Sequence, residues 1–174
     1  MSKERILVAG AGGQGIIFLG KLMANAALNT IPHVTFFPSY GIEVRGGASH
    51  CQVILSDDEI SSPVSARFDS LILMNQESME RFLPQLDRKG VAVVNSSLCE
   101  STPDPRVIAV PATREADRMG ALRSANLIML GTLLARRTFL KPAQIETTLR
   151  QFLTETPGAV DSNVAAFHAG LSGL

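Results

Sequence analysis

The chain has 174 residues, a length typical of one domain, and 45% of its residues are apolar, which is enough for a full hydrophobic core. Its 16 basic and 16 acidic side chains cancel, so the charge does not favour a nucleic acid or a membrane surface as the main partner, while it permits association with other proteins. No run is long and apolar enough to span a bilayer, and no signal peptide precedes the first strand, so we expect a cytoplasmic protein with a single domain over residues 1–174.

A glycine turn near the N-terminus is the first candidate site. A short apolar run at Ile6–Ala9 predicts a buried parallel strand, and apolar residues at helical spacing predict a helix over about 14–28. Between them the chain fits the pattern G-x-G-x-x-G through Gly10, Gly12 and Gly15. Such a turn presents free N–H groups and the positive end of a helix dipole, which predicts an anion site, most naturally for a phosphate. The alternative is a tight turn that binds no ligand.

Two more residues set this turn apart from most dinucleotide-binding turns. Gly13 and Gln14 occupy positions that usually vary, and Gln14 offers an amide to a ligand. The next predicted strand, His33–Phe37, is not followed by the Asp or Glu that would bind ribose hydroxyls in a NAD-binding fold. This absence argues against an ordinary NAD dehydrogenase.

The loop after the second predicted strand concentrates polar residues and glycines. Its candidate residues are Ser39, Tyr40, Glu43, Arg45, Gly46 and Gly47. We expect this loop to leave the carboxyl end of the strand next to the first one, beside the glycine turn, where open α/β sheets bind ligands. On chemistry alone, Glu43 and Arg45 either face a ligand or pair with each other and shape a surface loop.

The rest of the chain alternates between strand and helix patterns and predicts an α/β fold, with a Rossmann-like, mostly parallel sheet flanked by helices. The strand His50–Ser56, a turn and an extended segment at Ile60–Val64 predict a β-hairpin insert. The C-terminal part is predicted to be helical from Ala112, with Thr113 as a helix N-cap. The other predicted elements are strands at 68–75, 90–95 and 107–111, and helices at 77–83, 126–137, from Pro142 onward, and at 162–171.

The two cysteines, Cys51 and Cys99, lie far apart and form no C-x-x-C motif. We therefore expect two free thiols, and no iron–sulfur cluster or zinc site built by this chain alone. The three histidines show no metal-ligand spacing either.

Several motifs in one order resemble the gamma subunit of 2-oxoacid:ferredoxin oxidoreductases. The resemblance covers nearly the whole chain, and the glycine turn combined with the SYG-x-E-x-RGG loop is far more specific than either motif alone. The matching segments are Ala9–Ile16, Ser39–Gly47, Ser56–Pro63, Asn126–Gly131 and Asn163–Gly170. The first two segments are more similar to the 2-oxoglutarate and branched-chain members than to the pyruvate members. The chain departs from the family at Ile42, where members often have proline.

The resemblance implies one subunit of a complex that oxidatively decarboxylates a 2-oxoacid, with 2-oxoglutarate favoured, to an acyl-CoA and passes electrons to ferredoxin. It implies alpha, beta and ferredoxin-like delta subunits as partners, with thiamine diphosphate and iron–sulfur clusters on those partners. This chain has neither the thiamine diphosphate signature nor cluster cysteines. What it offers is the glycine turn and the polar loop, and in the family this subunit is implicated in receiving coenzyme A (CoA).

The resemblance leads to a hypothesis about the site. The backbone around Gly10, Gly12, Gly13 and Gly15, with the amide of Gln14, would bind a CoA phosphate. Residues of the polar loop, among them Tyr40, Glu43 and Arg45, would border the subunit interface and the CoA path. Arg45 would pair with a phosphate or carboxylate, or instead with a partner subunit. Asn126 would face the same edge, or would serve as a buried helix cap. No residue is assigned as a catalytic acid or base.

Two other functions are compatible with the sequence. The first is a free-standing Rossmann-type protein that binds a nicotinamide nucleotide. The second is a non-catalytic scaffold subunit whose glycine turn binds nothing.

Overall fold

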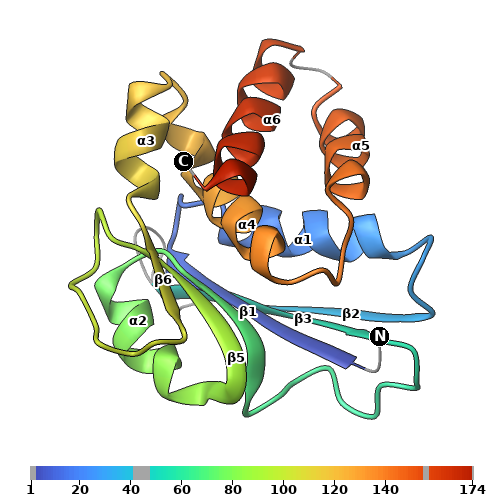
Figure 1. Ribbon diagram of the computed structural model, residues 1–174. Coiled ribbons are helices and arrows are strands. Elements are labelled where there is room, and N and C mark those ends of the chain that lie inside the picture. Colours follow the sequence, from blue (N-terminus) through green and yellow to red (C-terminus); the bar gives the residue numbers. More distant parts are fainter. Residues whose placement is uncertain (1–2, 41–47, 155–156, 174) are drawn as a thin grey trace.

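A six-stranded sheet organises the protein. The computed structural model describes residues 3–40, 48–154 and 157–173, and within them the sheet has the order β2-β3-β1-β4-β5-β6 (Figure 1). The strands are β1 (Lys3–Ala11), β2 (His33–Tyr40), β3 (Ala48–Ser56), β4 (Phe68–Leu73), β5 (Leu86–Asn95) and β6 (Val107–Val110). β1 lies near the middle of the sheet, so the turn that follows it lies at the centre of one sheet edge.

The sheet is mostly parallel, as the sequence predicts. β1, β4, β5 and β6 pair in parallel, whereas β3 is antiparallel to both of its neighbours, β1 and β2. The register places Ala11 opposite Ala48 and Tyr40 opposite Ser49. β2 therefore ends at the same edge as β1, but β3 lies between them. The expectation that β2 directly neighbours β1 is wrong.

Helices cover the two faces unequally. The helices are α1 (Ile16–Ala27), α2 (Gln76–Phe82), α3 (Ala112–Arg118), α4 (Ala125–Arg136), α5 (Pro142–Phe152) and α6 (Pro157–Ser172), with short 3-10 turns η1 (Leu83–Gln85) and η2 (Leu122–Ser124). α1 and α4 pack on one face, where α3, α5 and α6 also gather, and α2 lies on the other face (Figure 1). Alternate residues of β1 serve the two cores, with Ile6 and Val8 on the larger side and Leu7 and Ala9 on the smaller.

The predicted β-hairpin insert is wrong. The segment Ile60–Val64 is no strand and forms no hairpin with β3. It is mostly exposed, Pro63 has no N–H to donate to a ladder, and the hydroxyl of Ser62 bonds the backbone of Val64 in a local turn. The antiparallel partners of β3 are β1 and β2 instead.

Thr113 is not a helix N-cap. α3 begins at Ala112 with Pro111 in the cap position, so Thr113 already lies inside the helix. Its hydroxyl accepts a hydrogen bond of 2.8 Å from Asn95 Nδ2, at the carboxyl end of β5. The threonine therefore ties α3 to the sheet edge.

α4 and α6 cross at very short distance. A side chain at Gly131 of α4 would collide with the carbonyl of Phe167, and one at Gly170 of α6 would collide with the carbonyl of Ile128. The hydroxyl of Thr132 donates to Ile128 O at 3.1 Å and lies 3.3 Å from Gly170 O. Close backbone contact thus locks the C-terminal helix onto α4, which carries Asn126 near its start.

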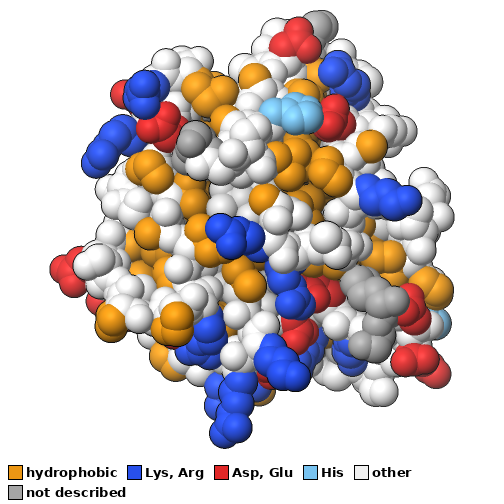
Figure 2. Space-filling view, viewed as in Figure 1, with side chains coloured by type: hydrophobic (Ala, Val, Ile, Leu, Met, Phe, Trp, Pro, Cys, Tyr) orange, Lys and Arg blue, Asp and Glu red, His pale blue; other side chains and the backbone are white. Residues whose placement is uncertain are grey.

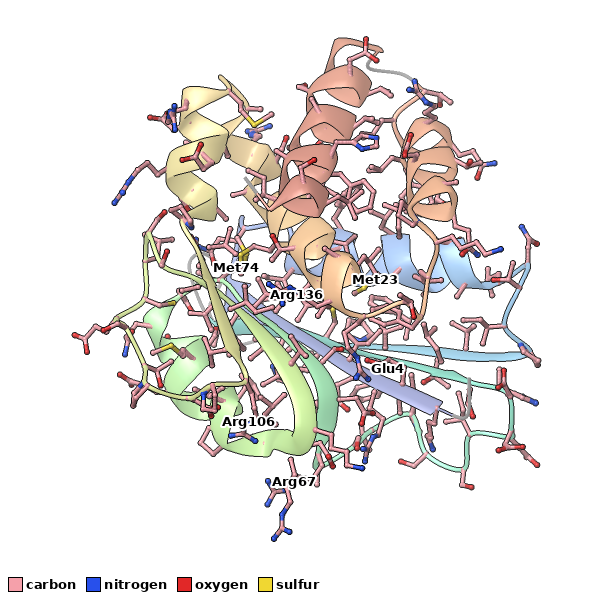
Figure 3. The ribbon with its side chains drawn as sticks, viewed as in Figure 1. Glu4, Met23, Arg67, Met74, Arg106 and Arg136 are labelled. Carbon is pink, nitrogen blue, oxygen red and sulfur yellow. The ribbon has the colours of Figure 1, made fainter. Side chains whose placement is uncertain are left out.

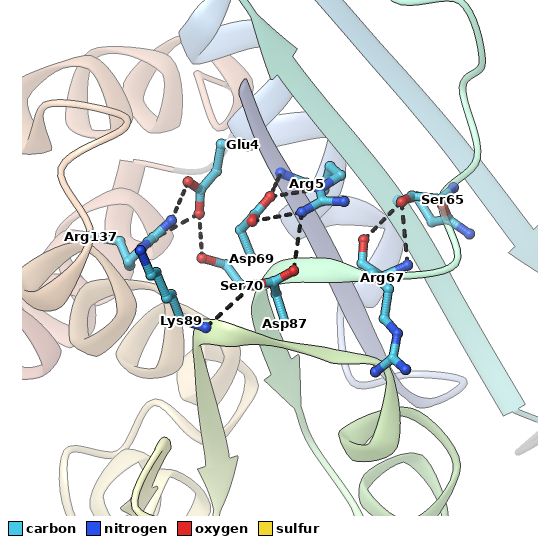
Figure 4. A network of polar contacts seen from close by, with 10 residues as sticks. Glu4, Arg5, Ser65, Arg67, Asp69, Ser70, Asp87, Lys89 and Arg137 are labelled. Atoms are coloured by element: carbon cyan, nitrogen blue, oxygen red, sulfur yellow. Dashed lines mark hydrogen bonds and ion pairs between the residues drawn. The ribbon is translucent and has the colours of Figure 1, made fainter. Parts of the chain in front are cut away.

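A polar network joins the elements at the opposite edge of the sheet (Figure 4). Glu4 is 4% exposed and accepts hydrogen bonds from Ser70 Oγ at 2.6 Å and from Arg137 Nε at 3.2 Å. Arg5 forms a two-point pair with Asp69, through Nε–Oδ2 at 2.8 Å and Nη2–Oδ1 at 2.9 Å. Glu4 and Met74 mark opposite ends of the central strands in Figure 3, so this network lies far from the glycine turn and serves stability.

The surface carries charges of both signs. Figure 2 shows several Lys and Arg side chains in the lower part of one face, where Figure 3 labels Arg67 and Arg106, with acidic side chains among them. Within the described residues, no helix is both long and apolar enough to cross a bilayer.

Candidate functional site

The glycine turn joins the central strand to the first helix. β1 continues to Ala11, two residues beyond the predicted end, so Gly10 is still in the strand. Gly13 has φ +92° and Gly15 has φ +73°, both in the left-handed region that L side chains rarely adopt. Gly12 and Gly13 are exposed at the tip of the turn. The backbone conformation therefore favours glycine at positions 13 and 15.

The start of α1 has the electrostatics of an anion site. Gly15 is the N-cap, no side chain caps the helix, and no acidic residue lies in its first turn. The first N–H groups of a helix have no partner within it and carry the positive end of the dipole. An anion at this turn would thus meet backbone donors and no carboxylate from the first turn of α1.

The side chain of Gln14 stabilises the turn by a hydrogen bond to its backbone. Its Oε1 accepts a hydrogen bond of 2.7 Å from the N–H of Ala11, and it occupies space that a side chain at Gly10 would fill, because such a Cβ would lie 2.5 Å from Oε1. The Nε2 group of Gln14 makes no hydrogen bond to a described residue. The Oε1 atom of Gln14 thus stabilises the turn, and its Nε2 group could donate a hydrogen bond to a ligand.

Asn126 reaches the turn from a distant part of the chain. It is the second residue of α4, and its Nδ2 donates a 3.1 Å hydrogen bond to the carbonyl of Gly15. A side chain at Gly15 would collide with this amide. Asn126 is not the helix cap, because Ser124 occupies that position. The structure thus brings Asn126 to the same edge as the glycine turn.

The side-chain oxygen of Asn126 accepts no hydrogen bond from a described residue. The residue is 3% exposed, and its Oδ1 has no hydrogen-bond partner among the described residues. A buried acceptor without a partner costs about 1–3 kcal/mol. Such a group is a reason to look for a ligand beside it.

A cavity of about 250 Å³ opens beside the turn. It lies between the turn, α3, η2 and the start of α4. The residues that line it are Gly13, Gln14, Met74, Leu98, Thr113, Leu122, Arg123, Ala125 and Asn126. Of these, the sequence pointed to Gly13, Gln14 and Asn126, whereas Leu98 and Leu122 are isolated apolar residues in polar segments and carry no recognisable motif.

Two ionisable side chains near the turn have shifted pKa values. Burial raises the pKa of the Cys51 thiol to about 12, and its Sγ lies 3.4 Å from the carbonyl of Ile16. Burial and the positive charge of Arg81 lower the pKa of His50, which packs against the ring of Phe82. At neutral pH both groups are uncharged, and neither adds a negative charge beside the turn.

The polar loop is only partly described. Ser39 lies in β2 opposite His50, and the backbone of Tyr40 ends this strand at the edge that also carries the glycine turn. The candidate residues Glu43, Arg45, Gly46 and Gly47 lie outside the described residues.

Neither cysteine forms a disulfide, as the sequence predicts. Across the described part of the chain, no three His, Cys, Asp or Glu side chains converge in a way that could hold a metal ion.

Comparison with known proteins adds an independent line of evidence. The family model described as pyruvate ferredoxin/flavodoxin oxidoreductase matches residues 5–173. The 2-oxoglutarate synthase subunit KorC of Archaeoglobus fulgidus is 34% identical over 166 residues, which cover 95% of this chain and 84% of that protein. The ketoisovalerate oxidoreductase subunit VorA of Methanothermobacter thermautotrophicus is 32% identical over 168 residues, or 95% of this chain. The chain spans only 35% of the length of this VorA.

Solved structures share the fold. The keto/oxoacid ferredoxin oxidoreductase gamma subunit of Geobacter sulfurreducens superimposes with a TM-score of 0.81 at 30% identity, covering 99% of this chain and 96% of that chain. The 2-oxoglutarate:ferredoxin oxidoreductase of Magnetococcus marinus, solved with 2-oxoglutarate, CoA and succinyl-CoA bound, superimposes with a TM-score of 0.87 at 25% identity. This match covers 99% of the present chain and 31% of that longer chain.

Proposed function

The chain belongs to the pyruvate ferredoxin/flavodoxin oxidoreductase family, and from this premise we propose that it is the gamma-type subunit of a 2-oxoacid:ferredoxin oxidoreductase. The complex would oxidatively decarboxylate a 2-oxoacid, form the acyl-CoA and pass the electrons to ferredoxin. The match over residues 5–173 confirms the family resemblance seen in the sequence, and the fold shared with a gamma subunit supports the assignment. The activity itself would belong to the assembled complex.

We favour 2-oxoglutarate as the substrate. Support comes from the 34% identity to a 2-oxoglutarate synthase subunit and from the likeness to an oxidoreductase solved with 2-oxoglutarate bound. The 32% identity to a ketoisovalerate oxidoreductase subunit makes a branched-chain 2-oxoacid the second candidate.

The proposed division of labour follows from the groups that each subunit carries. Thiamine diphosphate and the iron–sulfur clusters would reside on alpha, beta and ferredoxin-like delta subunits. Both cysteines of this chain are too far apart in sequence for a cluster motif, and burial raises the pKa of Cys51 to about 12 and that of Cys99 to about 11, which disfavours the thiolate that metals bind. Such a complex would work in the cytoplasm.

This chain would contribute a binding surface for CoA. The observation that carries the proposal is the glycine turn: two glycines at positive φ, an uncapped helix N-terminus and no acidic residue in the first turn of α1. These features suit a phosphate of CoA, which backbone N–H groups bind without any side-chain charge. The loop with Tyr40, Glu43 and Arg45 would border the interface and the path of CoA.

Gly13 permits a sharp test of the turn. A Cβ at Gly13 meets no atom within 4 Å, and both Asn and Asp tolerate a positive φ better than other residues do. Gly13→Asn and Gly13→Asp therefore match in shape and strain and differ in one negative charge. In the purified complex, we expect the KM for CoA to be about tenfold higher in the Asp variant than in the Asn variant, from about 1.4 kcal/mol of repulsion, with the KM for the 2-oxoacid equal in both. Equal KM values for CoA would refute the phosphate site.

Arg45 provides the corresponding test of the loop. Arg45→Ala would weaken either CoA binding or subunit assembly, because its guanidinium would pair with a phosphate of CoA or with a carboxylate of a partner subunit. The KM for CoA and the sedimentation of the complex separate these two roles. If Arg45→Ala changed neither, the loop would have no part in the function.

A further inference from the structure

β6 forms one edge of the sheet, and part of its backbone points away from the sheet. Within the described residues it is the last strand in the order, with β5 as its strand neighbour (Figure 1). The N–H of Ala92 donates to Arg106 O at 3.0 Å, and that of Ser96 donates to Val110 O at 2.8 Å. Because backbone groups alternate in direction along a strand, those of Ala109 point away from β5. The N–H and C=O of Ala109 are therefore available to a further strand.

The sequence of this edge does little to prevent such pairing. Val107–Val110 reads Val-Ile-Ala-Val, without the proline or charged residue that commonly keeps an edge strand unpaired. The opposite edge, β2, contains Pro38, which has no N–H to donate. With only four residues, β6 offers an added strand few backbone hydrogen bonds, so side chains must supply the rest of the affinity.

A cavity borders each face of β6. Ile108 packs against the larger core, and a cavity of about 210 Å³ lies there between Ile108 and Arg136 of α4. Val107 packs against the smaller core, and a cavity of about 200 Å³ lies there between Val107 and Glu100. Ala109 lines both cavities. Each is smaller than the roughly 300 Å³ that a whole small-molecule ligand needs, and suits one side chain. Successive residues of an added strand point to opposite faces, so one would enter each cavity.

Each cavity has one exposed, charged side chain. Arg136, at the end of α4 (Figure 3), has no ion pair or hydrogen bond with a described residue. The N–H of Glu100 donates to Gln76, but its carboxylate has no partner among the described residues. An acidic side chain would complement Arg136, and a basic one would complement Glu100. A second copy of β6 does not match this pattern, because Val107–Val110 contains neither an acidic nor a basic residue.

We propose that β6 receives an extended segment of a partner polypeptide as an additional strand, with an acidic side chain beside Arg136 and, at the adjacent position, a basic side chain beside Glu100. In strand addition of this kind, main-chain hydrogen bonds supply affinity and the pockets for alternate side chains supply specificity. The inference goes beyond the proposed function and does not depend on it, because the edge and both cavities belong to this chain alone.

The first experiment measures binding of the peptide acetyl-Thr-Val-Asp-Lys-Val-Thr-amide to the full chain by NMR titration. The matched control peptide has Asn in place of Asp. We expect its Kd to be about fivefold higher, and we expect Arg136→Gln to raise the Kd of the Asp peptide by the same factor. Both changes together should raise Kd no further than either alone, because they remove the same contact. The basic position is tested in the same way, with Gln in place of Lys in the peptide and Glu100→Gln in the chain.

Hydrogen exchange at two neighbouring amides tests strand addition itself. The N–H of Ala109 points outward, whereas the N–H of Ile108 points toward β5. When about nine-tenths of the chain carries the peptide, exchange of the Ala109 amide should slow about tenfold, with exchange of the Ile108 amide unchanged. Exchange at Ala109 that the peptide leaves unchanged would overturn the inference.

Three further results would also overturn it. One is the absence of peptide binding at millimolar concentration. Another is an equal Kd for the Asp and Asn peptides. The third is a dimer of the chain that protects the Ala109 amide without peptide and increases with protein concentration, since the edge would then belong to a second copy. The oxidoreductase activity of the complex is measured separately, so none of these results bears on the proposed function.

Discussion

Replacing Gly15 by alanine tests whether the glycine turn and α4 form one structural unit. Two costs add in this variant. The positive φ of 73° costs an L residue about 1–2 kcal/mol. The new methyl group also displaces the amide of Asn126, which loses its hydrogen bond to Gly15 O and leaves a further buried polar group unpaired, at about 1–3 kcal/mol. We expect Gly15→Ala to lower the free energy of unfolding by about 3–4 kcal/mol.

Gly13→Ala is the matched control for this variant. It carries the same kind of backbone strain, with φ +92°, but its methyl group meets no atom within 4 Å. We therefore expect a loss of only about 1–2 kcal/mol. For a chain of this length about 1 kcal/mol shifts Tm by roughly 2–4 °C, so Tm should fall by about 10 °C in Gly15→Ala and by about 4 °C in Gly13→Ala.

A double-mutant cycle in thermal or urea unfolding isolates the contact. Once Asn126→Ala has removed the amide, Gly15→Ala should cost no more than Gly13→Ala, which corresponds to a coupling of about 2 kcal/mol between positions 15 and 126. If Gly15→Ala cost the same with and without the Asn126 side chain, or no more than Gly13→Ala in the wild type, the packing of α4 against the turn would be refuted.

Three further variants test the rest of the fold by unfolding measurements. Burial acts to raise the pKa of Asp69, but the hydrogen bonds and charge of Arg5 outweigh it and lower this pKa, so the stabilisation is complete above the unfolded value of 3.8 and is lost as the pH falls below it. Asp69→Asn should lower the free energy of unfolding by about 1–2 kcal/mol at pH 7 and should reduce its further fall at acid pH. An unchanged dependence of stability on pH would contradict this. Arg137→Met leaves Glu4 buried without its cation and should cost about 3 kcal/mol, most of it recovered when Glu4→Gln is added; additive costs would count against the pair. Gly170→Ala forces α6 away from α4 and should lower the free energy of unfolding by about 1–3 kcal/mol. An unchanged free energy of unfolding would show that the two helices are not in such close contact.

Local sequence patterns were sufficient to predict most elements of this fold. Apolar periodicity located the strand within Lys3–Ala11 and the helices that start at Ile16 and Pro142, because burial of one face imposes that periodicity. Apolar periodicity does not determine the order of the strands in the sheet. β3 has the apolar run of any buried strand, and only the return of the chain after Tyr40 brings it back antiparallel between β1 and β2.

The candidate site was partly visible in the sequence for a similar reason. Of the three motif glycines, Gly15 has a positive φ and Gly10 leaves no room for a Cβ, whereas the second positive φ of the turn belongs to Gly13, which the motif does not specify. The hydrogen bond from Asn126 to Gly15 joins residues 111 positions apart, and no local rule connects them. Leu98 and Leu122 line the cavity only because the tertiary fold collects them there.

Purification of this chain from its native host under gentle conditions, followed by an activity assay of everything that is recovered with it, tests the central claim most directly. Our account predicts a complex with a thiamine diphosphate subunit and an iron–sulfur subunit that reduces ferredoxin only when both a 2-oxoacid and CoA are present, with 2-oxoglutarate as the best substrate. Recovery of the chain alone, as a monomer or homo-oligomer that binds a nicotinamide nucleotide, would contradict the account.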